Sequence, residues 1–215
     1  MSEKRRVFED FAADYDRWFD DHADVYRAQM RMLRRAVPSH GFGFEVGVGS
    51  GRFAVPLGIS CGIDPSLPLA RMARNRGVEV SLGCGEHLPY RSGAFDHILM
   101  MTVICFLDDV GAVFREVCRV LAPSGILVLG CIERDGAIFN HYHAEPEKGR
   151  FLRHARFYST EEIVRELQAA GFSVIEIIAR EQGFSVLMGK NHPVMEYERG
   201  TGPLVPLTEW IPPRF

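Results

Sequence analysis

The sequence contains only five cysteines, and they form no recognisable pattern. They are scattered between residues 61 and 131, and no two of them stand at the CxxC spacing. The absence of a CxxC pair argues against a structural zinc site. An odd number of scattered cysteines in mostly apolar surroundings is typical of reduced thiols. We therefore expect a cytoplasmic protein that binds no metal ion.

Long apolar runs and an excess of charge of either sign are lacking as well. The most apolar stretch, ILMMTVICFL at residues 98–107, is about half as long as a membrane span. The N-terminal sequence MSEKRRVFED has basic residues but no apolar segment behind them, which argues against a secretory signal. A formal net charge of −3 over 215 residues gives no electrostatic reason to expect nucleic acid or an anionic membrane as a partner.

What the sequence does contain is an alternation of β-rich runs and helical patterns. We predict strands at residues 42–47, 61–64, 78–82, 94–103, 125–132, 172–179 and 184–189. We predict helices over most of residues 7–36 and at residues 67–77, 109–121 and 161–171, the last preceded by a capping box from Ser159 to Glu162. This order indicates an α/β fold: a doubly wound, Rossmann-like, mainly parallel seven-stranded sheet with a terminal antiparallel hairpin and helices on both faces.

The chain divides into three parts by pattern. Residues 1–40 are expected to form an N-terminal helical cover, and residues 41–190 the main domain. Within that domain, residues of about 133–157 show no clean period, and a long connecting segment of this kind is often a lid or a binding loop. Residues 191–215 are rich in proline and are predicted to be irregular.

The stretch EVGVGSGRF, residues 45–53, follows the first predicted strand. A glycine-rich turn at this place lets a nucleotide approach the backbone closely. An NAD site prefers G-x-G-x-x-G, but here Arg52 stands at the place of the third glycine, and no phosphate-binding P-loop pattern is present. Asp64 ends the second strand, where a carboxylate can accept hydrogen bonds from both ribose hydroxyls. The alternative is that Asp64 merely caps the turn before Pro65.

Four motifs occur in order: EVGVGSGRF, GIDPS, GEHLPYRSGAFDHILM and LAPSGILVLG. Together they resemble motifs I to III of a class I S-adenosylmethionine-dependent methyltransferase of the small-molecule type 11 kind. The resemblance covers about residues 40–190. The chain also resembles a bacterial subgroup with a short interval between motif I and Asp64 and with the phrase RFYSTEE. The resemblance implies S-adenosylmethionine as cofactor, S-adenosylhomocysteine as product, and residues 41–190 as the cofactor-binding domain.

The resemblance also implies cofactor contacts at the ends of the strands. The positions are Gly47, Gly49 and Gly51 at the methionine portion, Glu45 near its amino group, Asp64 and Pro65 at the ribose, Gly85 and Glu86 beside the adenine, and Met100, Met101 and Thr102 near the transferable methyl group. The family often has an acidic residue where this chain has Cys84. The alternatives are that the two methionines fill the core and that Glu86 is a solvated loop carboxylate.

Methyl transfer from a sulfonium needs alignment and exclusion of water more than it needs an acid or a base. Tyr15, Trp18 and Phe19 are candidates for an aromatic cover at the substrate side, although they could simply pack on the sheet. His141, Tyr142 and His143 lie in the long segment after the fifth strand. His141 and His143, and more weakly Tyr15, are the candidate catalytic groups, whereas exposed lid histidines are the plainer interpretation.

Three hypotheses follow. The main one is a methyltransferase acting on a small-molecule N, O or S nucleophile. A nucleic-acid substrate is disfavoured because the chain has no basic patch, no [DN]PP[YF] after the fourth strand and no Pro-Cys pair. The second is a module that binds S-adenosylmethionine or S-adenosylhomocysteine without catalysis, and the third, an NAD-dependent oxidoreductase, is opposed by Arg52 and Glu45. The sequence does not indicate the acceptor or the oligomeric state.

Overall fold

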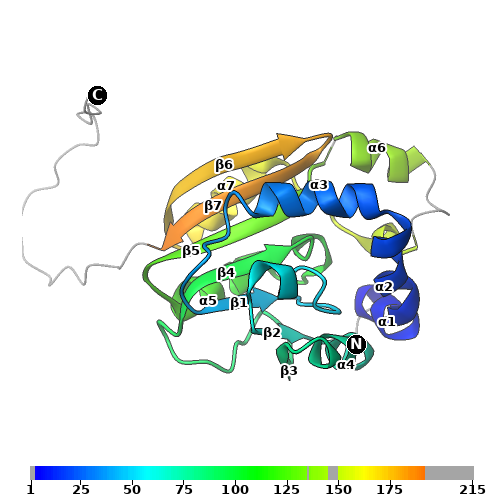
Figure 1. The fold of residues 1–215 in the computed structure, drawn as a ribbon. Coiled ribbons are helices and arrows are strands. Elements are labelled where there is room, and N and C mark those ends of the chain that lie inside the picture. The colour runs from blue at the N-terminus through cyan, green and yellow to red at the C-terminus, as the bar shows by residue number, and fades with distance from the viewer. Residues whose placement is uncertain (1–2, 135, 145–149, 192–215) are drawn as a thin grey trace, which may run out of the picture.

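The computed structural model describes residues 3–134, 136–144 and 150–191 of the chain. A seven-stranded sheet in the order β3-β2-β1-β4-β5-β7-β6 forms its centre (Figure 1). The strands are β1 (Gly43–Val46), β2 (Cys61–Asp64), β3 (Glu79–Leu82), β4 (Phe95–Met101), β5 (Leu121–Ile132), β6 (Phe172–Glu181) and β7 (Phe184–Asn191). Strands β1 to β5 pair in parallel, and β7 runs antiparallel to both of its neighbours, so the predicted fold is confirmed.

Helices cover both faces of this sheet. They are α1 (Glu3–Asp10), α2 (Ala12–Asp21), α3 (Ala23–Leu33), α4 (Leu67–Asn75), α5 (Val110–Val120), α6 (Ala137–Ala144) and α7 (Thr160–Ala169). Helix α3 crosses one face, and α5 and α7 lie on the opposite face (Figure 1). None of the helices in the described part of the chain has the length and apolar character needed to cross a membrane.

Strand β4 separates two hydrophobic cores, because its side chains point alternately to the two faces. Ile98 and Met100 are fully buried against α5 and α7. Leu99 and Met101 belong to the other core, which contains α2, α3 and α4. The nearly continuous apolar run of β4 is therefore buried on both faces of the sheet.

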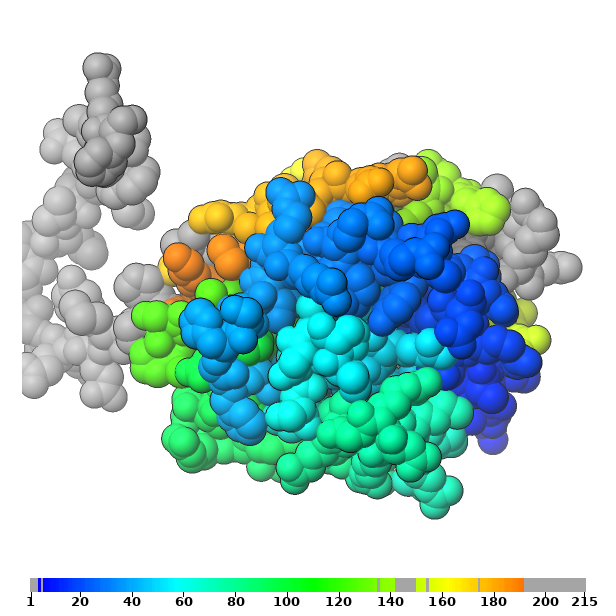
Figure 2. Space-filling model, in the orientation of Figure 1, coloured from blue at the N-terminus to red at the C-terminus, as the bar shows by residue number. Residues whose placement is uncertain are grey.

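The connection from β1 to β2 contains only a short 3-10 helix, Val55–Leu57, instead of an α-helix. Parallel strands normally need a helical crossover to cover the sheet face between them. Here the N-terminal helices supply that cover: Met30 and Leu33 of α3 share a buried core with Phe53 and Ala54. Figure 2 shows the N-terminal residues (blue) lying beside the residues that follow β1 (cyan). The N-terminal segment is thus built into the fold.

Residues 7–36 are mostly helical, as predicted, and consist of three helices broken at Phe11 and His22, where the backbone leaves the helical region. One local expectation needs correction. The segment of about 133–157 was predicted without regular structure but contains α6, which lacks a strong apolar stripe and so gave no periodic signal. The capping box from Ser159 to Glu162 is confirmed. The predicted irregular tail lies outside the described residues, apart from Asn191.

Candidate functional site

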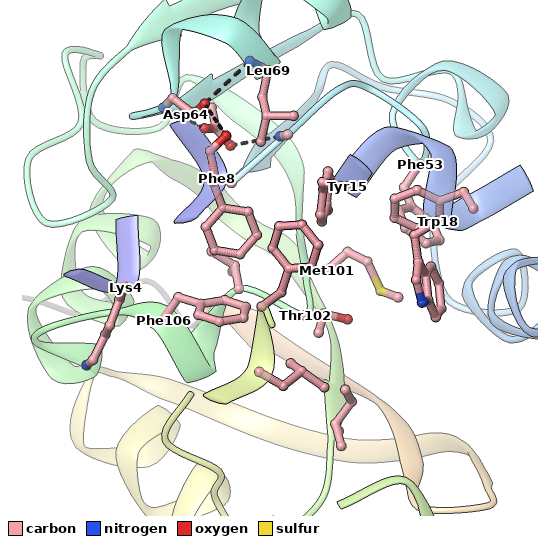
Figure 3. Close-up of a pocket in the computed structure, with 18 of the residues that line it drawn as sticks. Lys4, Phe8, Tyr15, Trp18, Phe53, Asp64, Leu69, Met101, Thr102 and Phe106 are labelled. Atoms are coloured by element: carbon pink, nitrogen blue, oxygen red, sulfur yellow. Dashed lines mark hydrogen bonds between the residues drawn. The ribbon is translucent and has the colours of Figure 1, made fainter. Parts of the chain in front are cut away.

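A cavity of about 830 Å³ lies at the carboxyl ends of β1, β2 and β4. In a doubly wound sheet this is the place where the strand order reverses and ligands bind. Most residues predicted from the sequence line the cavity: Tyr15, Trp18, Phe19, Gly47, Gly49, Asp64, Pro65, Cys84, Gly85, Glu86, Met101, Thr102 and His141. Figure 3 shows part of this wall, with Asp64 at the end of β2, Tyr15 on α2, and Met101 and Thr102 at the end of β4.

Three predicted residues stand outside the cavity wall. Met100 is fully buried in the core on the far side of β4, so Met101 takes its place at the cavity. Gly51 backs onto α4, because a Cβ there would lie 3.3 Å from Ala73. Glu45 is buried directly behind the glycine turn. The side chains of Tyr142 and His143 lie outside the described part of the structure.

The glycine turn requires glycine for its backbone conformation. Gly47, Gly49 and Gly51 have φ of +72°, +54° and +81°, a region that side chains rarely adopt. A Cβ on Gly47 would lie 2.5 Å from a methyl carbon of Val103. The backbone N–H groups of Gly47 and Val48 donate to the carbonyl of Ile63, which fixes the turn against the end of β2.

Two buried carboxyl groups, those of Glu45 and Asp64, lie close to this turn. The Gly49 N–H donates to Asp64 Oδ2 and the Ser66 N–H to Oδ1, both at 2.8 Å. Burial raises the pKa of Asp64 to about 6, although these two hydrogen bonds lower it in part. Burial, and then the charge of Asp64, also raise the pKa of Glu45 well above its usual value. Among the described residues no donor reaches Glu45 Oε2.

Helix α5 holds the loop that carries Gly85 and Glu86. The Leu88 N–H donates to Glu116 Oε2 at 2.8 Å. Arg119 donates to the carbonyl oxygens of Tyr90 and Leu88 at 2.8 and 3.0 Å. Sequence reasoning missed this support, because it depends on contacts between segments 28 to 31 residues apart.

Thr102, at the end of β4, has a strained backbone. Its φ of +50° is unusual for a β-branched residue, and its N–H donates to the carbonyl of Gly130 at 2.7 Å. Such outliers persist where surrounding structure enforces them, and they concentrate at functional sites. The strain here coincides with the cavity wall.

Aromatic side chains form a roof over the cavity. The ring of Phe8 lies 4.9 Å from Phe106, 5.4 Å from Tyr15 and 5.4 Å from Phe151, measured between centroids. Arg150 forms an ion pair with Asp14 at 2.9 Å. The N-terminal helices and the segment after β5 therefore meet above the strand ends (Figure 3).

Tyr15 is the roof residue that reaches the glycine turn. A Cβ on Gly49 would lie 3.4 Å from its hydroxyl oxygen. Burial and the negative charges of Asp64 and Glu45 raise the pKa of Tyr15 far above its usual value. The phenol therefore stays protonated at neutral pH, which suits a hydrogen-bond donor or an aromatic wall and not a base.

Known proteins share this architecture. A family model described as a methyltransferase domain matches residues 44–129. A solved structure from Thermotoga maritima, described as a SAM-dependent methyltransferase and possible histamine N-methyltransferase, is 35% identical. It aligns over 88% of this chain and 100% of that chain, with a TM-score of 0.82. The chain belongs to the class I S-adenosylmethionine-dependent methyltransferases.

Curated relatives of this methyltransferase extend the comparison. An uncharacterised protein of Methanocaldococcus jannaschii is 36% identical over 79% of this chain and 82% of its own length. The malonyl-[acyl-carrier protein] O-methyltransferase of Geobacter sulfurreducens is 28% identical over 83% of this chain and 73% of its own length. The chain spans 59% of the length of its 38% identical relatives in Mycobacterium tuberculosis.

The methyl donor of this family, S-adenosylmethionine, carries a cationic sulfonium, an ammonium group and two ribose hydroxyls. The site of this methyltransferase fits such a molecule. Buried carboxylates whose charge is incompletely satisfied attract cations and hydroxyl donors, and the glycine turn leaves the backbone accessible. Among the described residues no cluster of His, Cys, Asp or Glu side chains is arranged to hold a metal ion.

Proposed function

We propose that this protein transfers a methyl group from S-adenosylmethionine to an N, O or S atom of a small molecule that enters the same cavity. The observation that carries the proposal is the pair of buried carboxylates, Glu45 and Asp64, beside a glycine turn at the switch point of the sheet. Buried charge of this kind is costly unless a ligand compensates it.

Each wall of the cavity would contact a different part of the cofactor. Asp64 accepts hydrogen bonds from the ribose hydroxyls, next to Pro65. Gly47 and Gly49 allow the methionine portion to approach the backbone, and the carboxyl group of Glu45 lies behind it, near its amino group. Gly85 and Glu86 border the adenine. Gly51 supports this wall from outside by packing against α4.

The proposed chemistry is an in-line displacement. The sulfonium supplies an activated methyl group, and the protein must align the acceptor atom and exclude water. Thr102 and Met101, at the end of β4, border the place where the methyl group would lie. The aromatic roof of Phe8, Tyr15 and Phe151 excludes water from above.

The acceptor would bind between α2–α3 and the segment after β5. Trp18, Val25, Ile132 and Ile138 give this part of the wall an apolar character, His22, Gln29, Gln182 and His141 add polar groups, and Arg17 and Asp21 add charge. Such a lining suits a largely apolar small molecule with few polar groups.

Two histidines are candidates for taking a proton from the acceptor. His141 lines the cavity from α6. His22, which the sequence analysis did not consider, contacts the Trp18 carbonyl through Nδ1 at 2.9 Å. Because a carbonyl oxygen only accepts, Nδ1 donates this hydrogen bond, and in a neutral imidazole Nε2 is then the acceptor nitrogen.

Calorimetric titration with S-adenosylmethionine, S-adenosylhomocysteine and NADH tests the proposal. We expect micromolar binding of the first two, no binding of NADH, and loss of binding in Asp64→Ala. Binding of NADH alone would refute the proposal. Turnover with a panel of amines, phenols and thiols then separates an enzyme from a module that binds the cofactor without catalysis.

A further inference from the structure

Arg52, the residue at the place of a third glycine, forms an ion-pair fork with helix α2. Its Nε and Nη2 donate to the two oxygens of Asp16, each at 2.9 Å. Its Nη1 and Nη2 donate to the two oxygens of Asp20, each at 2.7 Å. Asp16 and Asp20 are four residues apart, so both point from the same side of α2 toward the glycine turn.

Arg76, which follows α4, completes the arrangement. It donates to Asp16 Oδ2 and to the carbonyl oxygen of Ser50, both at 2.7 Å. The Tyr26 hydroxyl donates to the carbonyl oxygen of Arg52 at 2.6 Å. The turn is therefore bound to the N-terminal helices through its backbone as well as through a side chain.

Burial makes this cluster stronger than an ordinary surface ion pair. The side chains of Arg52 and Asp16 are only 19% and 17% exposed, whereas that of Asp20 is 63% exposed. Burial alone would raise the pKa of Asp16, but hydrogen bonds from Arg52 and Arg76 outweigh it and hold the pKa well below its usual value. Bidentate, partly buried pairs of this type are stronger than exposed ones.

The cluster lies next to the residue that touches the turn. Tyr15 precedes Asp16 on α2, and its hydroxyl oxygen lies 3.4 Å from the place of a Cβ on Gly49. Trp18, which lines the cavity, stands between the two aspartates in sequence. A shift of α2 would therefore move both aromatic walls relative to the turn.

We propose that Arg52, Arg76, Asp16 and Asp20, here called the clasp, are positioning residues that hold α2 on the glycine turn and so keep Tyr15 closed over the methionine portion of the bound cofactor. This inference rests on the proposed function, because it assumes that the cofactor lies along Gly47 and Gly49. The clasp acts through Tyr15 and does not itself touch the reacting atoms.

Stopped-flow measurement of S-adenosylhomocysteine release tests the clasp. Trp18 fluorescence reports on the cavity in a Trp210→Phe background, which leaves it as the single tryptophan. We expect Arg52→Ala to speed release about tenfold, because α2 is then free to move Tyr15 away from the glycine turn and open the cavity. Arg52→Lys, which keeps the charge but loses the fork, should lie between the parent and Arg52→Ala.

Arg27→Ala is the matched control. Arg27 forms an exposed ion pair with Asp24, and both residues belong to α3 and not to the glycine turn. Arg27→Ala should therefore leave the release rate unchanged. A double-mutant cycle with Tyr15→Ala measures whether the two substitutions are coupled in their effect on the release rate. A general loss of structure in Arg52→Ala would not produce such coupling. If the clasp acts through Tyr15, Arg52→Ala has no further effect on release in the Tyr15→Ala protein.

The outcomes are distinguishable. Unchanged release in Arg52→Ala, or effects of Arg52→Ala and Tyr15→Ala that simply add, would overturn the clasp while the proposed function stands. Failure of the parent protein to bind S-adenosylhomocysteine would instead refute the proposed function. Should Arg52→Ala not fold, Asp20→Asn replaces it, because Asp20 is the exposed half of the fork; faster release supports the clasp, and unchanged release overturns it.

Discussion

Gly47 and Gly58 have nearly the same left-handed backbone, with φ of +72° and +74°, but different surroundings. A Cβ on Gly47 would lie 2.5 Å from Val103, whereas a Cβ on Gly58 would meet nothing within 4 Å. The pair therefore separates two reasons for a glycine: the conformation of the backbone and the space beside it. Only Gly47 lines the cavity.

We predict that Gly47→Ala and Gly58→Ala both lose stability but that only the first loses cofactor binding. The left-handed backbone costs each alanine about 1–2 kcal/mol. Gly47→Ala loses roughly 1–3 kcal/mol more, because its Cβ must displace Val103. Urea unfolding gives the free energies of unfolding, and calorimetry with S-adenosylhomocysteine gives the affinities. Equal losses of stability and unchanged binding in both variants would contradict the prediction.

At the scale of elements, α5 supports the site without lining it. Glu116 and Arg119 stand one turn apart on this helix and form an ion pair at 2.7 Å. Together they bind the backbone of Leu88 and Tyr90. The helix thus fixes the loop that brings Gly85 and Glu86 to the cavity, by hydrogen bonds to main-chain groups that any sequence in the loop would offer.

We predict that Arg119→Ala weakens binding of S-adenosylhomocysteine by about 1 kcal/mol, roughly fivefold in Kd, since two charge-assisted hydrogen bonds to the loop are lost. Hydrogen exchange should become faster in residues 84–90. Arg165→Ala, a substitution at an exposed position of α7, is the control and should change neither. Faster exchange without weaker binding would show that the loop does not hold the cofactor.

The elements were more predictable than the contacts between them. Strand β2 matches its predicted range, 61–64, because a short β-rich run ends there at Asp64 and a proline. The capping box before α7 is equally local. In the clasp, Arg52 binds Asp16, which lies 36 positions away, and Arg150 pairs with Asp14, which lies 136 positions away. No local pattern in the sequence indicates such contacts. In the sequence, Arg52 is conspicuous only because it stands at the place of a glycine.

At the scale of the whole molecule, the two buried carboxylates couple stability to pH. The folded protein binds protons at Asp64 and Glu45 more tightly than the unfolded chain, because both pKa values are raised. Their contribution to stability without cofactor is therefore present at low pH and is lost as the pH rises through the folded pKa, about 6 for Asp64. The charged forms are costly in the fold but are the forms that the cofactor needs.

We therefore predict that the rise in Tm caused by S-adenosylhomocysteine shrinks as the pH falls from 8 to 5. Ribose hydroxyls bind the ionised carboxylate of Asp64, so each pH unit below its pKa weakens binding about tenfold. A ligand that binds only the folded state raises stability by RT ln(1 + [L]/Kd), so weaker binding means a smaller shift. Thermal unfolding with and without a fixed concentration of S-adenosylhomocysteine measures this rise in Tm at each pH. Asp64→Asn, in which only Glu45 of the two carboxyl groups can still ionise, should show a smaller shift that varies less with pH, and a constant shift in the parent protein would mean that Asp64 does not hold the ribose.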